Sequence, residues 1–282
     1  FESCALFMAD IKLDKYSALW VSHSSIGDFL KCPRAYFLRN IYRTRDNRKI
    51  NLVSPALSLG QAVHETLENL ANYKAEIRFL QPLEKAFEEN WKKVSGKIGG
   101  FKNLEEEIDI KEHARKMVQR VQQNPGPLLN KTLKIKSGEN PTLPNFYLSE
   151  KENIILCGKI DWLEYIEKDD SVRVIDFKTG RKDEDQKSLQ LPIYILLLNS
   201  LQKRKVSGAA YWYLERENEP SSVPLPEINN SYERVLSVAM KVKEAKDRGI
   251  FECSRGKSGC FACRPFERIL RGEAEFVGIG GY

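Results

Sequence analysis

The hydrophobic positions in the first half of the chain repeat at the spacing of helices. Between residues 56 and 130, apolar side chains recur three and four residues apart, at Leu67, Leu70, Leu80, Leu83, Phe87 and Trp91. This spacing places them on one face of a helix. The glycines of 96–100 interrupt the pattern, and a second helix is predicted over 105–123. The preceding segment, 17–50, begins with serines suited to capping a helix and continues as an amphipathic stretch.

The pattern changes at residue 146. Three segments rich in β-branched and aromatic residues, separated by turn-forming residues, predict an antiparallel meander: 146–149, 154–165 and 172–177. A helix, a strand and a last helix are expected after them: 185–202, 209–214 and 231–248. Gly249 is a suitable stop for the last helix.

These elements predict an α/β protein with a mixed central sheet flanked by helices. A helical insertion lies near the N-terminus, and a tail containing cysteines follows the last helix. The chain divides accordingly into an N-terminal extension, a helical region, a core, and a C-terminal helix with its tail: 1–16, 17–145, 146–230 and 231–282.

Composition and charge narrow the range of functions. The 282 residues are 41% hydrophobic, which is typical of a folded protein. The chain has neither an apolar run long enough to cross a membrane nor a secretory signal, so a cytoplasmic protein is expected. Segment 31–49 holds seven basic residues against one acid, and segment 241–271 holds nine against four. Two basic segments suit a polyanionic partner, although an ordinary solvated surface would give the same counts.

Two acidic residues and a lysine form the strongest candidate site. Asp161 stands at the end of one predicted strand, in Gly158-Lys159-Ile160-Asp161, and Asp176 and Lys178 end a later one. Residues two apart in a strand project to the same face, so Asp176 and Lys178 should lie together. Two carboxylates suit a hard cation such as Mg²⁺, and an ammonium beside them can position a metal-bound water. In isolation an Asp-x-Lys pair is more often a surface feature.

Three further polar residues accompany this set. His64 is one of only three histidines and lies in the first predicted helix, where a structural role is the usual explanation. Gln190 and Tyr194 are four residues apart and therefore share a helix face just after Lys178. Each feature is ordinary by itself, and their order along the chain is what distinguishes them.

This order resembles the PD-(D/E)xK superfamily, and within it the RecB-like exonucleases, which include the AddB nuclease domain and the CRISPR-associated adaptation nucleases. The resembling motifs are Gly-x-x-x-His at 60–64, Gly-x-Ile-Asp at 158–161, Ile-Asp-Phe-Lys-Thr-Gly at 175–180, Gln-x-x-x-Tyr at 190–194, and the opening segment 22–37. The resemblance implies a restriction-endonuclease-like core. It also implies that Mg²⁺ or Mn²⁺ is bound by His64, Asp161, Asp176 and the carbonyl of Phe177.

The resemblance further implies that Lys178 is the catalytic lysine and that Gln190 and Tyr194 shape the path of DNA. Arg34 and Tyr36, in the first basic segment, are additional candidates for contact with DNA. The aromatic residues suggested as stacking surfaces for bases are Tyr36, Tyr42, Tyr194, Trp212 and Tyr213. The second acidic position holds Asp176 where many members have glutamate, and both supply the same oxygen ligands.

Four of the six cysteines form a second candidate site. Cys4 is near the chain start and Cys157 lies in a predicted strand, whereas Cys260-x-x-Cys263 has the spacing of two thiolates on one metal. RecB-like relatives with an iron–sulfur cluster use one N-terminal and three C-terminal cysteines. Cys32, Cys260 and Cys263 match that arrangement, no cysteine stands near residue 269, and Cys253 is the candidate for the fourth ligand. A [4Fe–4S] cluster, a zinc ion and no metal are the three alternatives.

The sequence therefore predicts a metal-dependent deoxyribonuclease. We expect an exonuclease acting on single-stranded or unwound DNA ends, in DNA repair or CRISPR adaptation, with a repair helicase or CRISPR adaptation proteins as candidate partners. A sequence-specific endonuclease is a second enzymatic reading. A nuclease-like scaffold that binds DNA without cutting it is the non-enzymatic alternative.

Overall fold

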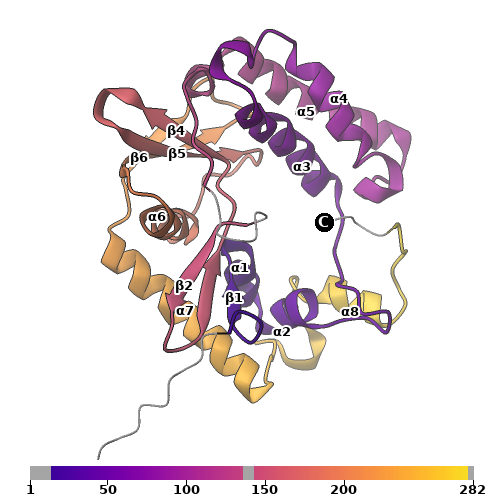
Figure 1. The fold of residues 1–282 in the computed structure, drawn as a ribbon. Coiled ribbons are helices and arrows are strands. Elements are labelled where there is room, and N and C mark those ends of the chain that lie inside the picture. Colours follow the sequence, from indigo (N-terminus) through magenta and orange to yellow (C-terminus); the bar gives the residue numbers. More distant parts are fainter. Residues whose placement is uncertain (1–13, 136–142, 279–282) are drawn as a thin grey trace, which may run out of the picture.

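A four-stranded mixed sheet lies at the centre of the computed structural model, which describes residues 14–135 and 143–278. Its order is β4-β5-β6-β7, with bounds Trp162–Ile166, Ser171–Lys178, Lys205–Tyr213 and Ser221–Val223. The β4/β5 and β6/β7 pairs are antiparallel, whereas β5 and β6 are parallel. Parallel strands need a crossover, and helix α6 (Gln190–Leu201) provides it (Figure 1).

The two faces of this sheet carry different cores. Along β5, Val172 and Val174 pack in the core that contains α6 and α7 (Ile228–Arg248), while Ile175 and Phe177 pack in the other. Because side chains alternate along a strand, Asp176 and Lys178 follow the valines to the α6 side. The hydrophobic pattern of β5 thus determines where its polar residues point.

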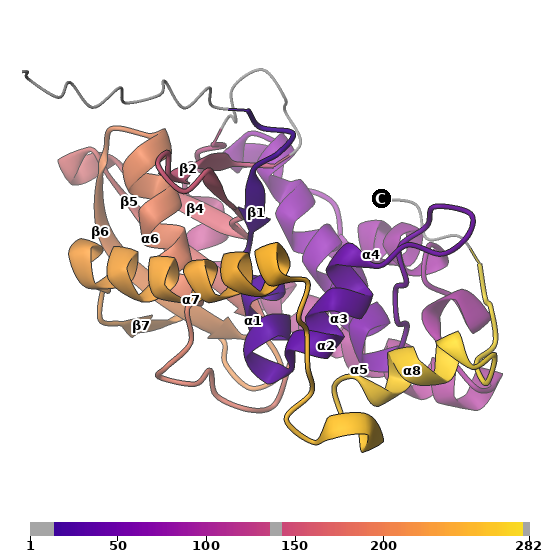
Figure 2. The same cartoon turned by 90° about the horizontal axis from the view of Figure 1, so that it is seen from below.

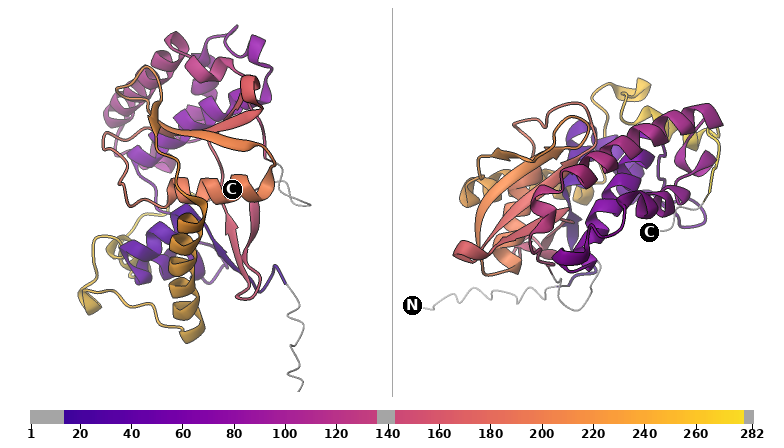
Figure 3. Two further views of the ribbon diagram at one scale, coloured as in Figure 1. Left: turned by 90° about the vertical axis from the view of Figure 1, so that its left-hand side faces the viewer. Right: turned by 90° about the horizontal axis from the view of Figure 1, so that it is seen from above.

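Three helices cover the opposite face (Figure 3). They are α3 (Pro55–Glu68), α4 (Leu83–Lys92) and α5 (Leu104–Gln123). Their apolar faces surround Trp162 and Trp212, which the sheet buries completely on this side. The helical insertion expected near the N-terminus is therefore packed onto the sheet, and its helix α3 brings His64 close to Phe177, near the end of β5. Single 3-10 turns lie between or beside these elements: Asn69–Asn72, Ala75–Ile77, Gly96–Gly99, Gly126–Leu129, Glu167–Asp169 and Gly256–Ser258.

A second, three-stranded sheet has the order β1-β3-β2, formed by Leu19–Val21, Ile154–Cys157 and Asn145–Ser149. Strand β1 is parallel to β3 and β2 is antiparallel to it. Helix α1 (His23–Lys31) starts directly after β1, capped by reciprocal hydrogen bonds between Ser22 and Ser25. Beyond α1 lie helix α2 (Pro33–Tyr36), its π-helical continuation (Phe37–Ile41) and α8 (Arg264–Leu270). In Figure 2, α2 and α8 lie past the end of α7 that is near α1.

The α/β fold class with mixed sheets and flanking helices is confirmed, but the predicted meander is wrong in one respect. The segment 154–165 is two strands in two different sheets, separated by residues 158–161. Gly158 lies against α6, where an added Cβ would stand 3.0 Å from Cδ1 of Leu197. Asp161 therefore lies in the segment that connects β3 to β4, directly before β4, and not at the end of a strand.

Smaller differences concern element ends. The helix predicted over 185–202 begins only at Gln190, and strand β1 was not foreseen. Helix α7, which was predicted to be the last helix, ends at Arg248 as expected, with Gly249 in the left-handed region at φ 65°, but the short helix α8 follows it. Cys4 and most of the predicted N-terminal extension lie outside the described residues. Among the described residues, none of the helices is both long and apolar enough to span a membrane.

Candidate active site

Asp176 and Lys178 project together from the end of β5, toward α6. The Lys178 ammonium lies 2.9 Å from Oδ2 of Asp176. The Asp176 carboxylate is only 1% exposed, although a carboxylate is among the groups most costly to bury. The other Asp176 oxygen, Oδ1, accepts two hydrogen bonds, whereas the buried Oδ2 is paired with the Lys178 ammonium.

Helix α6 supplies the donors to Oδ1. Gln190 Nε2 donates at 2.5 Å and the Tyr194 hydroxyl donates at 3.0 Å. The Gln190 Oε1 atom in turn accepts from the Lys178 ammonium at 2.5 Å. The two helix residues therefore orient the carboxylate and the lysine. Tyr194 is buried, so its ring is not an open stacking surface for a base.

Asp161 reaches the same region from the segment that connects β3 to β4. Its Oδ2 accepts a hydrogen bond from the backbone N–H of Phe177 at 2.9 Å, next to Asp176 in the chain. His64 comes from α3, with Nδ1 3.5 Å from Oδ2 of Asp161. The structure thus brings His64, Asp161 and Asp176 into one region; that these residues and the Phe177 carbonyl bind a metal stays a prediction.

Glu68 joins this group and was not foreseen. It lies one helical turn after His64, with Oε1 3.3 Å from His64 Nδ1, and its other oxygen forms an ion pair with Lys159. One ligand atom from each of His64, Glu68 and Asp161 lies within 4.8 Å of the others. Asp176 is outside this compact trio because Gln190 and Tyr194 hold its carboxylate. The i,i+4 spacing of Glu68 from His64 is a signal that sequence reasoning could have used.

The ionisation of these groups reflects crowded negative charge. Burial and the neighbouring Asp161 raise the pKa of Asp176 to about 7, against the opposing effect of Lys178. Burial alone would lower the pKa of His64, but its contacts with Asp161 and Glu68 raise it to about 10. A buried carboxyl group with a raised pKa close to a histidine with a raised pKa is typical of a functional site.

The donor set fits a hard divalent metal. Carboxylate oxygens from Glu68, Asp161 and Asp176 and one imidazole are the ligand types that Mg²⁺ and Mn²⁺ accept. Among the described residues, the buried Oδ2 of Asp176 is paired with the Lys178 ammonium alone, so it keeps a lone pair with which it could bind a cation.

Lys178 has a further partner in Glu184, which the sequence did not indicate. The ammonium lies 2.7 Å from Oε2 of Glu184, in the loop between β5 and α6. Asp176, Gln190 and Glu184 thus place three oxygens around a group with three donors. The backbone N–H of Glu184 donates to the Tyr213 hydroxyl at 2.9 Å, which fixes the loop at this point. Burial would lower the pKa of Lys178, but the flanking carboxylates raise it.

The other residues predicted to touch DNA have different places. Arg34 is half-exposed and forms an ion pair with Glu267 of α8. Tyr36 is 3% exposed and packs edge-on against Phe29 and stacked on Phe251, so it contributes to the core instead of a stacking surface. Trp212 and Tyr213 are buried as well, and Tyr42 alone of the suggested stacking residues is half-exposed.

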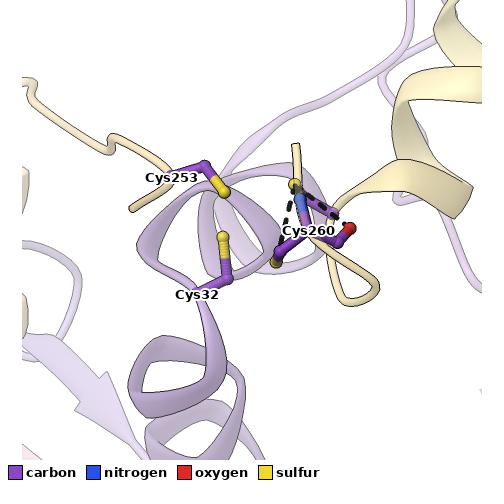
Figure 4. Close-up of side chains that lie close together, drawn as sticks. Cys32, Cys253 and Cys260 are labelled. Carbon is purple, nitrogen blue, oxygen red and sulfur yellow. Dashed lines mark hydrogen bonds between the residues drawn. The ribbon is translucent and has the colours of Figure 1, made fainter. Parts of the chain in front are cut away.

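The four cysteines of the second candidate site converge. Cys32 lies between α1 and α2, and Cys253, Cys260 and Cys263 lie between α7 and α8. All four are buried and free of disulfides, and their Sγ atoms lie within 4.8 Å of one another (Figure 4). Cys157 lies elsewhere, with its thiol directed at the Val21 carbonyl at 3.4 Å. The assignment of Cys253 to the group is thereby supported by geometry.

The thiols of this group differ in acidity. Burial raises the pKa of Cys32 to about 12. Burial acts in the same direction on Cys260, but the backbone N–H groups of Cys263 and Ala262 hold the pKa of that thiol down to about 6. Thiolates are the metal-binding form of cysteine, so the chain backbone favours ligation at Cys260.

The chain is similar to known proteins over most of its length. The chain resembles a candidate exonuclease from Eubacterium rectale whose structure is known, with 14% identity and a TM-score of 0.43, over 98% of this chain and 89% of that one. A search of curated proteins finds no significant match. The sequence profile of the PD-(D/E)XK nuclease superfamily matches residues 20–267, a span that includes every residue of both candidate sites. The protein belongs to the PD-(D/E)XK nuclease superfamily.

Proposed function

We propose that this protein is a divalent-metal-dependent deoxyribonuclease whose reaction takes place at Asp161, Asp176 and Lys178. The observation that supports this most directly is the Asp176 carboxylate. It is buried, oriented by Gln190 and Tyr194, and paired with Lys178. Burying a charged group costs free energy, and buried titratable groups held in place by several partners are common at functional sites.

His64, Asp161 and Asp176 are the proposed metal ligands, with Glu68 as an additional one. A bound Mg²⁺ or Mn²⁺ supplies a water of lowered pKa and stabilises the negative charge that develops on the phosphate. Lys178 lies on the Asp176 side of this group, where its ammonium can orient that water or contact a phosphate oxygen. Gln190 and Tyr194 keep both side chains in place.

The proposed substrate is DNA with free ends, single-stranded or unwound, cut by a RecB-like exonuclease. The ordered motifs from residue 22 to residue 194 support this branch of the superfamily. DNA repair and CRISPR adaptation are the proposed settings, with a helicase or adaptation proteins as partners. A scaffold without activity is disfavoured because such a protein has no need of the Asp161, Asp176 and Lys178 set.

The test uses three end-labelled substrates with Mn²⁺ or Mg²⁺: linear single-stranded DNA, the same strand closed into a circle, and blunt duplex DNA. We expect cleavage of the linear single strand, resistance of the circle, and loss of cleavage with EDTA. Cutting of the circle at the same rate would contradict the need for ends while preserving the nuclease proposal. DNA binding without cleavage under any metal would favour the scaffold.

A further inference from the structure

The four-cysteine group is too compact for the iron–sulfur cluster that the resemblance implies. In a [4Fe–4S] cluster each thiolate binds a different iron, and the eight-atom inorganic core separates the four thiolate sulfurs. Here all four Sγ atoms lie within 4.8 Å of one another. No core of four irons and four sulfides fits among sulfurs that are so close, so this group does not suit the cluster.

The same distances suit a single tetrahedral ion. Zinc–thiolate bonds of about 2.3 Å at tetrahedral angles place neighbouring sulfurs about 3.8 Å apart. The Sγ atoms of Cys260 and Cys263 are 3.8 Å apart. The four cysteines are at most 7% exposed, and Leu38, Ile50 and Phe266 belong to the same buried hydrophobic cluster. Full protein ligation in a closed site is the usual arrangement of structural zinc.

The loop between Cys253 and Cys263 is shaped for such a site. The backbone N–H of Cys260 donates to Sγ of Cys263 at 3.1 Å, and the N–H groups of Ala262 and Cys263 face Sγ of Cys260. Hydrogen bonds of this kind stabilise thiolate ligands. Gly259 has φ 67°, and a Cβ on it would stand 3.1 Å from Sγ of Cys263. Glycine is thus required both by the turn and by the space around the sulfur.

The position of the fourth ligand differs from the family arrangement in a way that matches this geometry. Where the last cysteine of iron–sulfur relatives would stand, Ile269 instead packs against the group as an apolar residue. Cys253 replaces it from the opposite side of the Cys-x-x-Cys pair. We propose that Cys32, Cys253, Cys260 and Cys263 bind one zinc ion in a closed tetrahedral site, in place of a [4Fe–4S] cluster.

Metal analysis of full-length protein tests this directly. The protein is produced in medium supplemented with both iron and zinc and is purified without oxygen. We expect one zinc per chain, little iron, and a colourless sample. Replacement of the metal by Co²⁺ should give the intense visible ligand-field bands of a tetrahedral thiolate site. A brown protein with about four irons per chain, or protein free of both metals, would overturn the proposal.

Three variants test whether Cys253 is the fourth zinc ligand or whether its replacement only disturbs the fold. Cys253→Ser should lose most of the zinc or weaken its binding by roughly a hundredfold, whereas Cys157→Ser, a buried cysteine outside the group, should retain it. Cys253→His keeps a zinc ligand in case the serine variant does not fold, and should shift the Co²⁺ bands from the four-sulfur pattern to a three-sulfur, one-nitrogen pattern. Unchanged Co²⁺ bands in Cys253→His would exclude Cys253 as a ligand. None of these readouts depends on DNA cleavage.

Discussion

Asp176 shows at the scale of one residue how a carboxylate proposed to bind a metal is held inside a protein. Its environment opposes ionisation through burial and through Asp161, and supports it through Lys178 and the donors on α6. Such a balance leaves the carboxylate ready to exchange a proton for a cation. Isolated surface carboxylates have neither the burial nor the oriented donors.

Replacing Asp176 with asparagine should therefore weaken metal binding strongly and abolish cleavage without unfolding the protein. Asparagine keeps the shape and one oxygen acceptor but loses the charge. Even outer partners of metal ligands are worth roughly 10- to 100-fold, so a ligand itself should cost about 100-fold or more in Mn²⁺ affinity. Calorimetric titration with Mn²⁺ measures this. Lys178→Met is the matched control: it should stop cleavage but keep Mn²⁺ affinity, and wild-type cleavage by either variant would refute the assignment.

Glu184 should act through Lys178 without contacting the metal. In Glu184→Gln the ammonium keeps its contacts with Asp176 and Gln190 but loses one carboxylate. We expect kcat to fall roughly tenfold with KM for DNA and Mn²⁺ affinity unchanged, because only the orientation of Lys178 is affected.

Asp183→Asn is the comparison for this variant, since Asp183 lies in the same loop but is exposed and pairs with Arg216. It should cleave at close to the wild-type rate. Equal losses in the two variants would mean that the loop as a whole matters, and that Glu184 has no specific link to Lys178.

The two residues that sequence reasoning missed were hidden for different physical reasons. Glu68 follows His64 by one helical turn, so the helix periodicity contained the information. Glu184 lies in an irregular loop, and its contact with Lys178 depends on Tyr213, which comes from a different strand. A loop side chain has no periodicity to fix its direction, and only the tertiary structure places it.

At the scale of elements, the hydrophobic pattern predicted the positions of most helices and strands. It did not predict where one hydrophobic run is divided between two sheets. Residues 154–165 have a continuous strand-like pattern, yet close packing of Gly158 on α6 separates β3 from β4. The interruption frees Asp161 from the strand ladder, so that its carboxylate can accept the Phe177 N–H. Helix ends with clear capping residues were predicted within a few residues, as Gly249 shows.

The end of α7 gives a prediction about element stability. Gly249→Ala places a Cβ on a residue with φ 65°, which costs about 1–2 kcal/mol for an L-residue. Gly27 lies inside α1 with no atom within 4 Å of an added Cβ, so Gly27→Ala should stabilise by about 0.5–1 kcal/mol. Urea unfolding of both variants measures the two effects. The free energy of unfolding should therefore fall in Gly249→Ala and rise in Gly27→Ala. A change of the same sign in both variants would contradict the argument from backbone conformation.

At the scale of the molecule, the cysteine group connects the two ends of the fold. Cys32 and Cys253 are more than 200 residues apart in sequence, and the four-stranded sheet with α6 lies between them. The group has its own small hydrophobic core, made of residues from the α2 region and the tail. Arg34 of α2 and Glu267 of α8 add an ion pair across the same contact. The sequence indicated this connection through cysteine spacing, but could not show which metal would fit.

Loss of the bound metal should consequently loosen both ends together and leave the central sheet formed. The thiols contribute nothing to the packing of β5, β6 and α6, whose cores are separate from the cysteine group. Metal binding and local folding are coupled because the unfolded segments hold no preformed site.

In Cys260→Ala, hydrogen exchange of residues 32–42 and 253–270 should therefore accelerate at least about tenfold, while amides of β5 and α6 stay protected. DNA binding should weaken in parallel, because both basic segments are attached to these ends. Cys157→Ser should change neither segment. If exchange accelerates in the tail alone, then the metal site does not hold the N-terminal helices, and the connection between the two ends rests on hydrophobic packing.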